Sequence, residues 1–79
     1  MNSTELLIAS AQEIIDEEGV PRSVVASMKQ LIDNLNSDGD IKIRKDKGIY
    51  MLEDVVNNDN IDPYIRTQLL DIVAHLEQL

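Results

Sequence analysis

Apolar residues recur with a helical period in four segments of the chain. The clearest segment is 20–35, where Val24, Met28, Leu31 and Leu35 share one face at about 100° per residue. Segments 4–18, 41–57 and 61–76 each carry an apolar arc of the same kind. Residues 41–45 alternate as a strand would, but the helical period continues to 57. The pattern therefore predicts four amphipathic helices.

Capping residues predict where the first two helices begin and end. Asn2, followed three residues later by Glu5, has the capping-box arrangement at the start of the first helix, and Ser3 and Thr4 are the alternative caps. That helix is predicted to run to about Glu18, before Gly19. Pro21 suits the first position of the second helix, because its missing N–H is not needed there.

Similar residues bound the second pair of helices. The turn formers of 36–39 end the second helix, and Asp40 is predicted to cap the third. The third helix is predicted to run roughly from Ile41 to Asn57, where the polar run 57–60 breaks it. Asp62 then caps the fourth helix, which has Pro63 at its first position.

The apolar pattern of the first half returns after 41 residues. The matched pairs are Ile8 and Ile49, Ala11 and Leu52, Ile14 and Val55, Ile15 and Val56, Val20 and Ile61, Val24 and Ile65, Met28 and Leu69, Leu31 and Ile72, Ile32 and Val73, and Leu35 and Leu76. This repeat predicts a helical hairpin that is used twice.

Short connections make neighbouring helices antiparallel, and four short helices bury their apolar faces only together. The sequence thus predicts an all-α fold, an antiparallel four-helix bundle of two hairpins, as a single domain over residues 1–79. The alternative is an open stack of two hairpins, as in HEAT-type solenoids. Two repeats are few for a solenoid, so the closed bundle is favoured.

Composition narrows the class of function. The 79 residues include no Cys, Trp or Phe, so the core consists of aliphatic residues and methionine, without disulfides. A net charge of −8 argues against a wide phosphate-binding surface. No apolar run approaches the ~20 residues of a membrane span, and the first residues lack the features of a secretion signal. We therefore expect a cytoplasmic protein without membrane contact.

Three short motifs resemble those of a known family. The matching residues are Val20, Pro21 and Arg22 in the first motif, Leu52, Glu53, Asp54 and Val55 in the second, and Asn58, Asp59, Asn60, Pro63, Arg66, Thr67, Ile72 and Val73 in the third. In these motifs the chain resembles uncharacterised protein family 0147, a family of small archaeal proteins. It departs from the family at Val25, where an arginine is expected, and at or near Leu70, where a tryptophan is expected. The resemblance implies an all-helical bundle and no established activity.

Four of the seven basic residues lie in the first turns of the third helix: Lys42, Arg44, Lys45 and Lys47. Cations at this end oppose the helix macrodipole, which hints at an anionic partner such as RNA or an acidic protein. The favoured interpretation is a solvated face that pairs with Asp38, Asp40 and Asp46 and with the acidic first helix.

Arg22 and Arg66 lie near the starts of the second and fourth helices. We expect a structural role, in which each bonds carbonyls of the preceding turn or an acid of a neighbouring helix. Anion binding by these two arginines is the alternative.

Catalytic and metal-binding motifs do not emerge from the sequence. A calcium loop that starts at Asp38 would place Lys42 and Ile49 at ligand positions, so it fails. His75 is the only histidine, and no nucleophile motif accompanies it. We therefore predict that the chain is not an enzyme and has no metal or cofactor.

The apolar residues outside the main arcs are Ile43 and Tyr50 on the third helix, with Met51 beside them, and also Leu6 and Leu70. They suggest a surface for a protein partner or for a second copy in a homodimer. The sequence thus favours a small, non-enzymatic interaction or structural module. The alternative is a nucleic-acid-associated factor that uses the basic start of the third helix.

Overall fold

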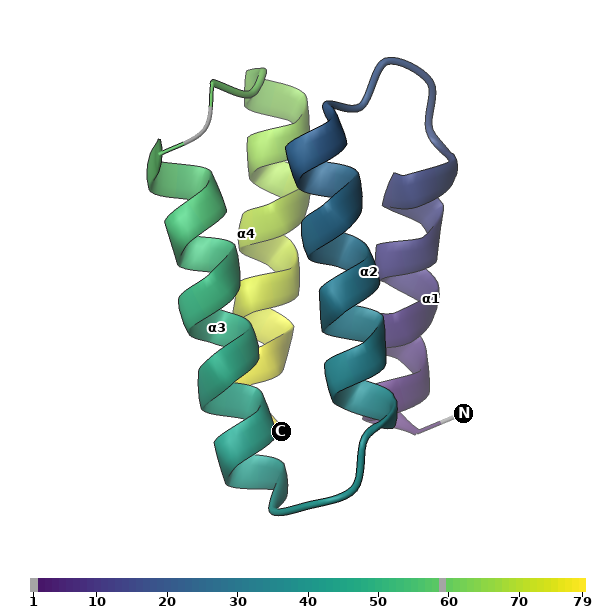
Figure 1. Ribbon diagram of the computed structural model, residues 1–79, viewed down its shortest axis with the longest axis vertical. Helices are drawn as coiled ribbons and strands as arrows, with labels where there is room; N and C mark the ends of the chain where they lie inside the picture. The colour runs from purple at the N-terminus through teal and green to yellow at the C-terminus, as the bar shows by residue number, and fades with distance from the viewer. Residues whose placement is uncertain (1, 59) are drawn as a thin grey trace.

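The computed structural model describes residues 2–58 and 60–79 and contains four helices (Figure 1). They are α1 (Ser3–Asp16), α2 (Arg22–Asn36), α3 (Ile41–Asn58) and α4 (Pro63–Glu77). No strand occurs among the described residues. The predicted all-α class is therefore confirmed. Asp59, which belongs to the third family motif, lies outside the described residues.

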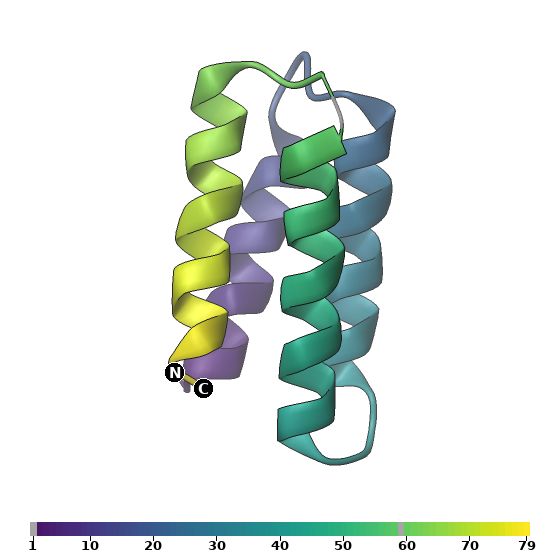
Figure 2. The ribbon, with the colours of Figure 1, turned by 90° about the vertical axis from the view of Figure 1, so that its left-hand side faces the viewer.

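The four helices form a closed ring. Helix α1 packs against α2 and α4, and α3 packs against the same two helices. Across the described residues, neither α1 and α3 nor α2 and α4 are in contact. Consecutive helices run antiparallel, as Figures 1 and 2 show. The closed four-helix bundle is thus confirmed over the open stack, which would have placed equivalent helices of the two hairpins against each other.

The repeated apolar positions form the core. The most buried side chains come from all four helices: Leu7, Ala11, Ile14, Val24, Met28, Leu31, Leu35, Leu52, Val55, Val56, Ile61, Ile65, Leu69, Ile72, Val73 and Leu76. Ile8, Ile15, Val20, Ile32 and Ile49 are partly buried against them. Each matched pair of the 41-residue repeat therefore contributes both its members to one shared core.

Side-chain caps begin three of the helices. Asn2 Oδ1 accepts a hydrogen bond from Glu5 N, and Asp62 Oδ1 accepts one from Ile65 N, both at 2.8 Å. Asp40 Oδ1 accepts from the backbone N–H of residue 42 at 2.8 Å. These carboxylate and amide oxygens satisfy N–H groups that the first helical turn leaves unpaired. The three predicted caps are confirmed.

Two predicted boundaries are wrong by a residue or two. Helix α1 ends at Asp16, and the backbone of Glu17 is already extended, so the helix stops short of Glu18. Pro21 lies at the N-cap of α2, with a backbone outside the helical region, because the helix begins at Arg22. Ile41, whose spacing places it on the apolar arc of segment 41–57, is nevertheless 41% exposed, since it is the first residue of α3 at the end of the bundle.

Substitution by aspartate tests the assignment of helix faces. Met28 and Leu69 are both 0% exposed, so Met28→Asp or Leu69→Asp would place an unpaired carboxylate in the core. That costs several kcal/mol, against about 5–15 kcal/mol of total stability in a typical domain. We expect both variants to lose their helical circular dichroism signal, whereas the exposed changes Lys29→Asp and Asp71→Lys should keep it.

Candidate functional site

Arg44, at the start of α3, fastens that helix to the end of α2. Its Nη1 donates a hydrogen bond to the carbonyl oxygen of Leu35 at 3.0 Å. In return, Asn34 Nδ2 donates to the carbonyl oxygen of Arg44 at 2.7 Å. Leu35 lies in the last turn of α2, whose carbonyls have no partner within the helix. The guanidinium group therefore caps the C-terminal end of α2.

Lys45 caps the C-terminal end of α4 in the same way. Its Nζ donates to the carbonyl oxygen of Glu77 at 3.2 Å and to the backbone oxygen of Leu79 at 3.4 Å. Because the helices are antiparallel, the N-terminus of α3 lies beside the C-terminal ends of α2 and α4. The partial negative charge at those ends offsets the unfavourable position of the cations in their own helix. Arg44 and Lys45, both half-buried, thus bond carbonyls rather than the acids that the sequence suggested.

The remaining two cations of this group have other surroundings. Lys42 and Lys47 are exposed, and Lys47 lines a groove between α2 and α3. The four basic residues therefore do not form one free cationic patch. Arg44 and Lys45 donate hydrogen bonds to backbone oxygens at the C-terminal ends of neighbouring helices, and Lys42 and Lys47 extend into solvent.

Arg66 repeats this capping on the opposite end of the bundle. Its Nη1 donates to the carbonyl oxygen of Val56, in the last turn of α3. The predicted structural role is thus seen for Arg66, with its acceptor in the helix rather than in the loop. Arg22, at the first position of α2, is exposed.

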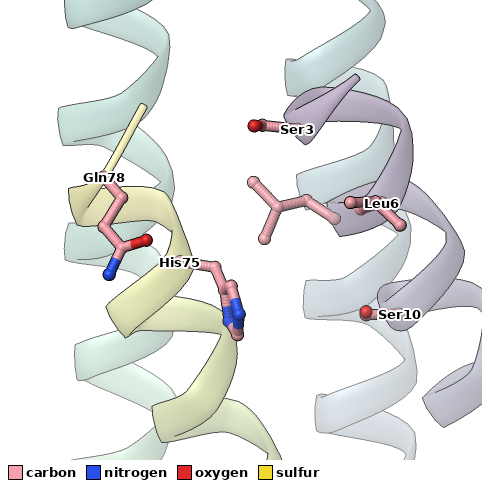
Figure 3. Close-up of a pocket in the computed structure, with 6 residues that line it drawn as sticks. Ser3, Leu6, Ser10, His75 and Gln78 are labelled. Carbon is pink, nitrogen blue, oxygen red and sulfur yellow. The ribbon is translucent and has the colours of Figure 1, made fainter. Parts of the chain in front are cut away.

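A groove of about 280 Å³ lies between α1 and α4, lined by Ser3, Leu6, Leu7, Ser10, His75 and Gln78. Figure 3 shows Ser3, Leu6 and Ser10 on one wall and His75 and Gln78 on the other. His75 Nδ1 lies 2.7 Å from the carbonyl oxygen of Asp71, so this nitrogen carries the proton in the neutral ring. The groove offers hydroxyl, imidazole and amide groups, and no carboxylate lies among its lining residues.

A second groove, of about 450 Å³, lies between α2 and α3 and is equivalent to the first by the 41-residue repeat. Here Gly48 occupies the position of Leu7, and Asn34 that of His75. A Cβ atom on Gly48 would lie 3.1 Å from Leu31 Cδ1, so α3 approaches α2 closely at this point.

Of the apolar residues predicted outside the main arcs, Leu6, Ile43, Tyr50 and Leu70 lie on the surface, whereas the prediction for Met51 is wrong, because this residue packs partly buried against the core. Ile43 is 69% exposed, Tyr50 76% and Leu70 47%. Tyr50 also lines a shallow hollow of about 270 Å³ on α3, together with Glu53, Asp54 and Asn57. Ile43, Tyr50 and Leu70 are here called the Tyr50 face. Each of them exposes apolar area to solvent that is not buried in the core.

Sequence reasoning missed the contacts that tie helix ends across the bundle. Gln68 Nε2 donates to Glu17 Oε1 at 2.8 Å, which links α4 to the end of α1. Asn34, which anchors Arg44, was not singled out either. Gln68 and Asn34 are polar residues at the edge of an apolar arc. That position is the only feature of the sequence that indicates a contact with a neighbouring helix.

Over the ranges 2–58 and 60–79, no group of three or more His, Cys, Asp or Glu side chains could hold a metal ion. In the same ranges, no helix is long and apolar enough to cross a lipid bilayer. Among the described residues, the fold thus places three cations at the C-terminal carbonyls of neighbouring helices and forms grooves between α1 and α4 and between α2 and α3. It leaves the large apolar side chains of Leu6, Ile41, Ile43, Tyr50, Tyr64 and Leu70 exposed.

Removing a capping cation should lower stability. Arg44→Ala and Arg66→Ala each leave a carbonyl of a helix end without its charged donor, which should reduce the free energy of unfolding by about 1–2 kcal/mol. Urea denaturation measures this change. Lys42→Ala, on the exposed side of the same α3 turns, should stay within about 0.5 kcal/mol of the parent. Equal losses in all three variants would contradict the capping assignment.

Comparison with known proteins places the chain in a family. A UPF0147 protein of Methanopyrus kandleri is 41% identical over 69 residues, which cover 86% of this chain and 66% of the relative, just under two thirds. A UPF0147 protein of Methanocaldococcus jannaschii is 31% identical over 68 residues, 85% of this chain and 73% of the relative. The crystal structure of MMP1188, a protein of unknown function, has a TM-score of 0.88 at 26% identity and covers 98% of this chain and 89% of its own. The model of the uncharacterised protein family UPF0147 matches residues 2–79, and the chain belongs to this family.

Proposed function

We propose that this chain is a non-enzymatic helical module that binds another protein through the Tyr50 face, formed by Ile43, Tyr50 and Leu70. One observation carries the proposal. The two hairpins share a core pattern, but their outer surfaces differ where the Tyr50 face lies.

The repeat supplies an internal comparison for each residue of the Tyr50 face. Tyr50 and Leu70 correspond to Ala9 and Lys29 of the first hairpin, which are exposed helical residues, whereas Ile43 corresponds to Asn2, the N-cap that precedes α1. The same frame therefore folds with polar or small residues at the equivalent positions. Folding alone does not account for the large apolar side chains of the second hairpin, and exposed aromatic and aliphatic side chains are typical anchors of protein interfaces.

The alternative, a nucleic-acid-associated factor, has less support. Arg44 and Lys45 donate to backbone oxygens of α2 and of the C-terminal residues, which leaves Lys42 and Lys47 to face a phosphate. Two lysines on a chain of net charge −8 supply little of the electrostatic affinity that nucleic-acid binding requires.

A non-enzymatic role is supported by the chemistry of the α1–α4 groove. The ring nitrogen Nδ1 of His75 bonds a carbonyl of its own helix, and none of the lining residues is an acid that could orient the ring toward Ser3 or Ser10. A catalytic serine needs a base that is held in place. A cytoplasmic location remains the prediction from the sequence.

The proposal predicts which substitutions abolish capture of a partner. Immobilised protein should retain a protein from a lysate of the native host, and the double variant Tyr50→Ala, Leu70→Lys should lose it. These changes install the residues found at the equivalent positions of the first hairpin, so the fold should be kept. Mass spectrometry of the eluates measures the loss.

Leu6→Lys is the matched control, because Leu6 is exposed to 54% on α1 and its equivalent residue is also lysine, Lys47. It should capture the same protein as the parent. If the double variant retains every protein that the parent retains, the proposed function is wrong.

A further inference from the structure

We infer that the bond between Asp38 and Gly39, in the loop that joins α2 to α3, is a site of spontaneous isoaspartate formation in the folded protein. The product carries a free α-carboxylate on an exposed loop, and this group makes it a substrate for enzymes that methylate isoaspartyl residues. The site is separate from the Tyr50 face, and its formation requires only water.

The reaction joins the side chain of an aspartate to the backbone nitrogen of the next residue. The amide nitrogen of Gly39 attacks Cγ of Asp38 in its carboxylic acid form, a C–N bond forms, and the amide proton leaves with the hydroxyl group as water. A second water then opens the resulting succinimide ring. Addition at Cγ restores aspartate, whereas addition at the main-chain carbonyl carbon leaves the chain running through Cβ and Cγ, which is isoaspartate.

Both reacting groups are unengaged in this loop. Asp38 is exposed, and over residues 2–58 and 60–79 neither its carboxylate nor the N–H of Gly39 takes part in a hydrogen bond. Gly39 has a φ of 126°, a backbone conformation that favours glycine, and no atom lies within 4 Å of the place where a Cβ would stand. The loop therefore leaves room for the ring, and no side chain on the attacking residue hinders its closure.

A neighbouring bond shows how the fold selects this site. An asparagine before a serine closes the same ring with loss of ammonia, because a serine side chain is small. Asn36 is the last residue of α2, however, and the N–H of Ser37 donates to the carbonyl oxygen of Asn34 at 3.2 Å. Attack by that nitrogen would break the hydrogen bond and unwind the end of the helix, so the Asn36–Ser37 bond is protected in the folded protein.

The aspartates that cap helices are protected by the residues that follow them. Asp40 precedes Ile41, whose β-branched side chain crowds the ring, and Asp62 precedes Pro63, which has no amide proton to lose. Aspartates inside the helices are followed by N–H groups that bond carbonyls of the preceding turn. Compared with these positions, the Asp–Gly bond combines an unhindered nucleophile with a free carboxyl group.

The bundle can accommodate the product. Asn34 Nδ2 donates to the carbonyl oxygen of Arg44 at 2.7 Å, and Asp40 Oδ1 accepts from the backbone N–H of Lys42 at 2.8 Å, so hydrogen bonds hold both sides of the loop. Isoaspartate adds one main-chain atom between them. Residues 37–40 are exposed, and their loop lies at the lower end of the bundle in Figure 1, where it takes up the extra length.

The new α-carboxylate thus stays accessible in the folded chain. A methyltransferase moves a methyl group from the sulfonium of S-adenosylmethionine to an oxygen of this carboxylate and releases S-adenosylhomocysteine.

Ageing of the folded protein tests the inference. Parent protein is kept folded at neutral pH for days and then digested with trypsin, which releases residues 30–42 as one peptide that contains both bonds. We expect isoaspartate at position 38, seen as a peptide of unchanged mass with a shifted retention time and located by electron-transfer fragmentation. Asn36 should stay intact in the folded protein and become deamidated when the protein is aged in guanidinium chloride.

Asp38→Glu is the matched control, because it keeps the charge and would need a six-membered ring, which closes much more slowly. With an isoaspartate methyltransferase and labelled S-adenosylmethionine, the aged, undigested parent should accept at least fivefold more methyl groups than the aged variant. Equal acceptance would place the modified residue elsewhere and overturn the inference. It also falls if a synthetic peptide of residues 30–42 forms isoaspartate at position 38 while the folded protein does not.

Discussion

Every helix in this bundle depends on the other three for the burial of its apolar stripe. A helix of 14 to 18 residues is marginal alone in water, and a pair of such helices leaves part of each apolar stripe exposed. The 41-residue repeat supplies two hairpins with matching stripes, which close on each other as α1 on α4 and α2 on α3. This mutual burial sets the ring order and the positions of the helix ends.

The antiparallel ring has an electrostatic consequence at those ends. It brings the N-terminal turns of α3 beside the C-terminal carbonyls of α2 and α4, where Arg44 and Lys45 form their hydrogen bonds. Arg66 makes the equivalent contact to α3 from the start of α4. Cations that oppose the macrodipole of their own helix thus stabilise the ends of neighbouring helices. The basic start of α3 is explained largely by packing, without an anionic ligand.

The sequence predicts what depends on local period and caps, and misses what depends on which helix ends meet. Met28 and Leu69 are buried as their spacing predicts, and Asn2 and Asp62 form the predicted caps. The acceptor of Arg44 lies in α2, and those of Lys45 lie at the end of α4 and at Leu79, 32 and 34 residues away, so no local pattern could identify them. Of the candidate site, the sequence predicts the exposure of the Tyr50 face but not the hollow beside it, which requires side-chain positions.

Comparing equivalent positions of the two hairpins separates residues that the fold requires from residues that other constraints select. Where both hairpins carry equivalent apolar residues, as at Leu31 and Ile72, the shared core is a sufficient cause. Where one hairpin carries Tyr50 and the other Ala9, the frame tolerates both, so the difference needs a cause outside the core. Exposed apolar area reduces solubility without adding to the core. A partner that covers Tyr50 would remove that cost.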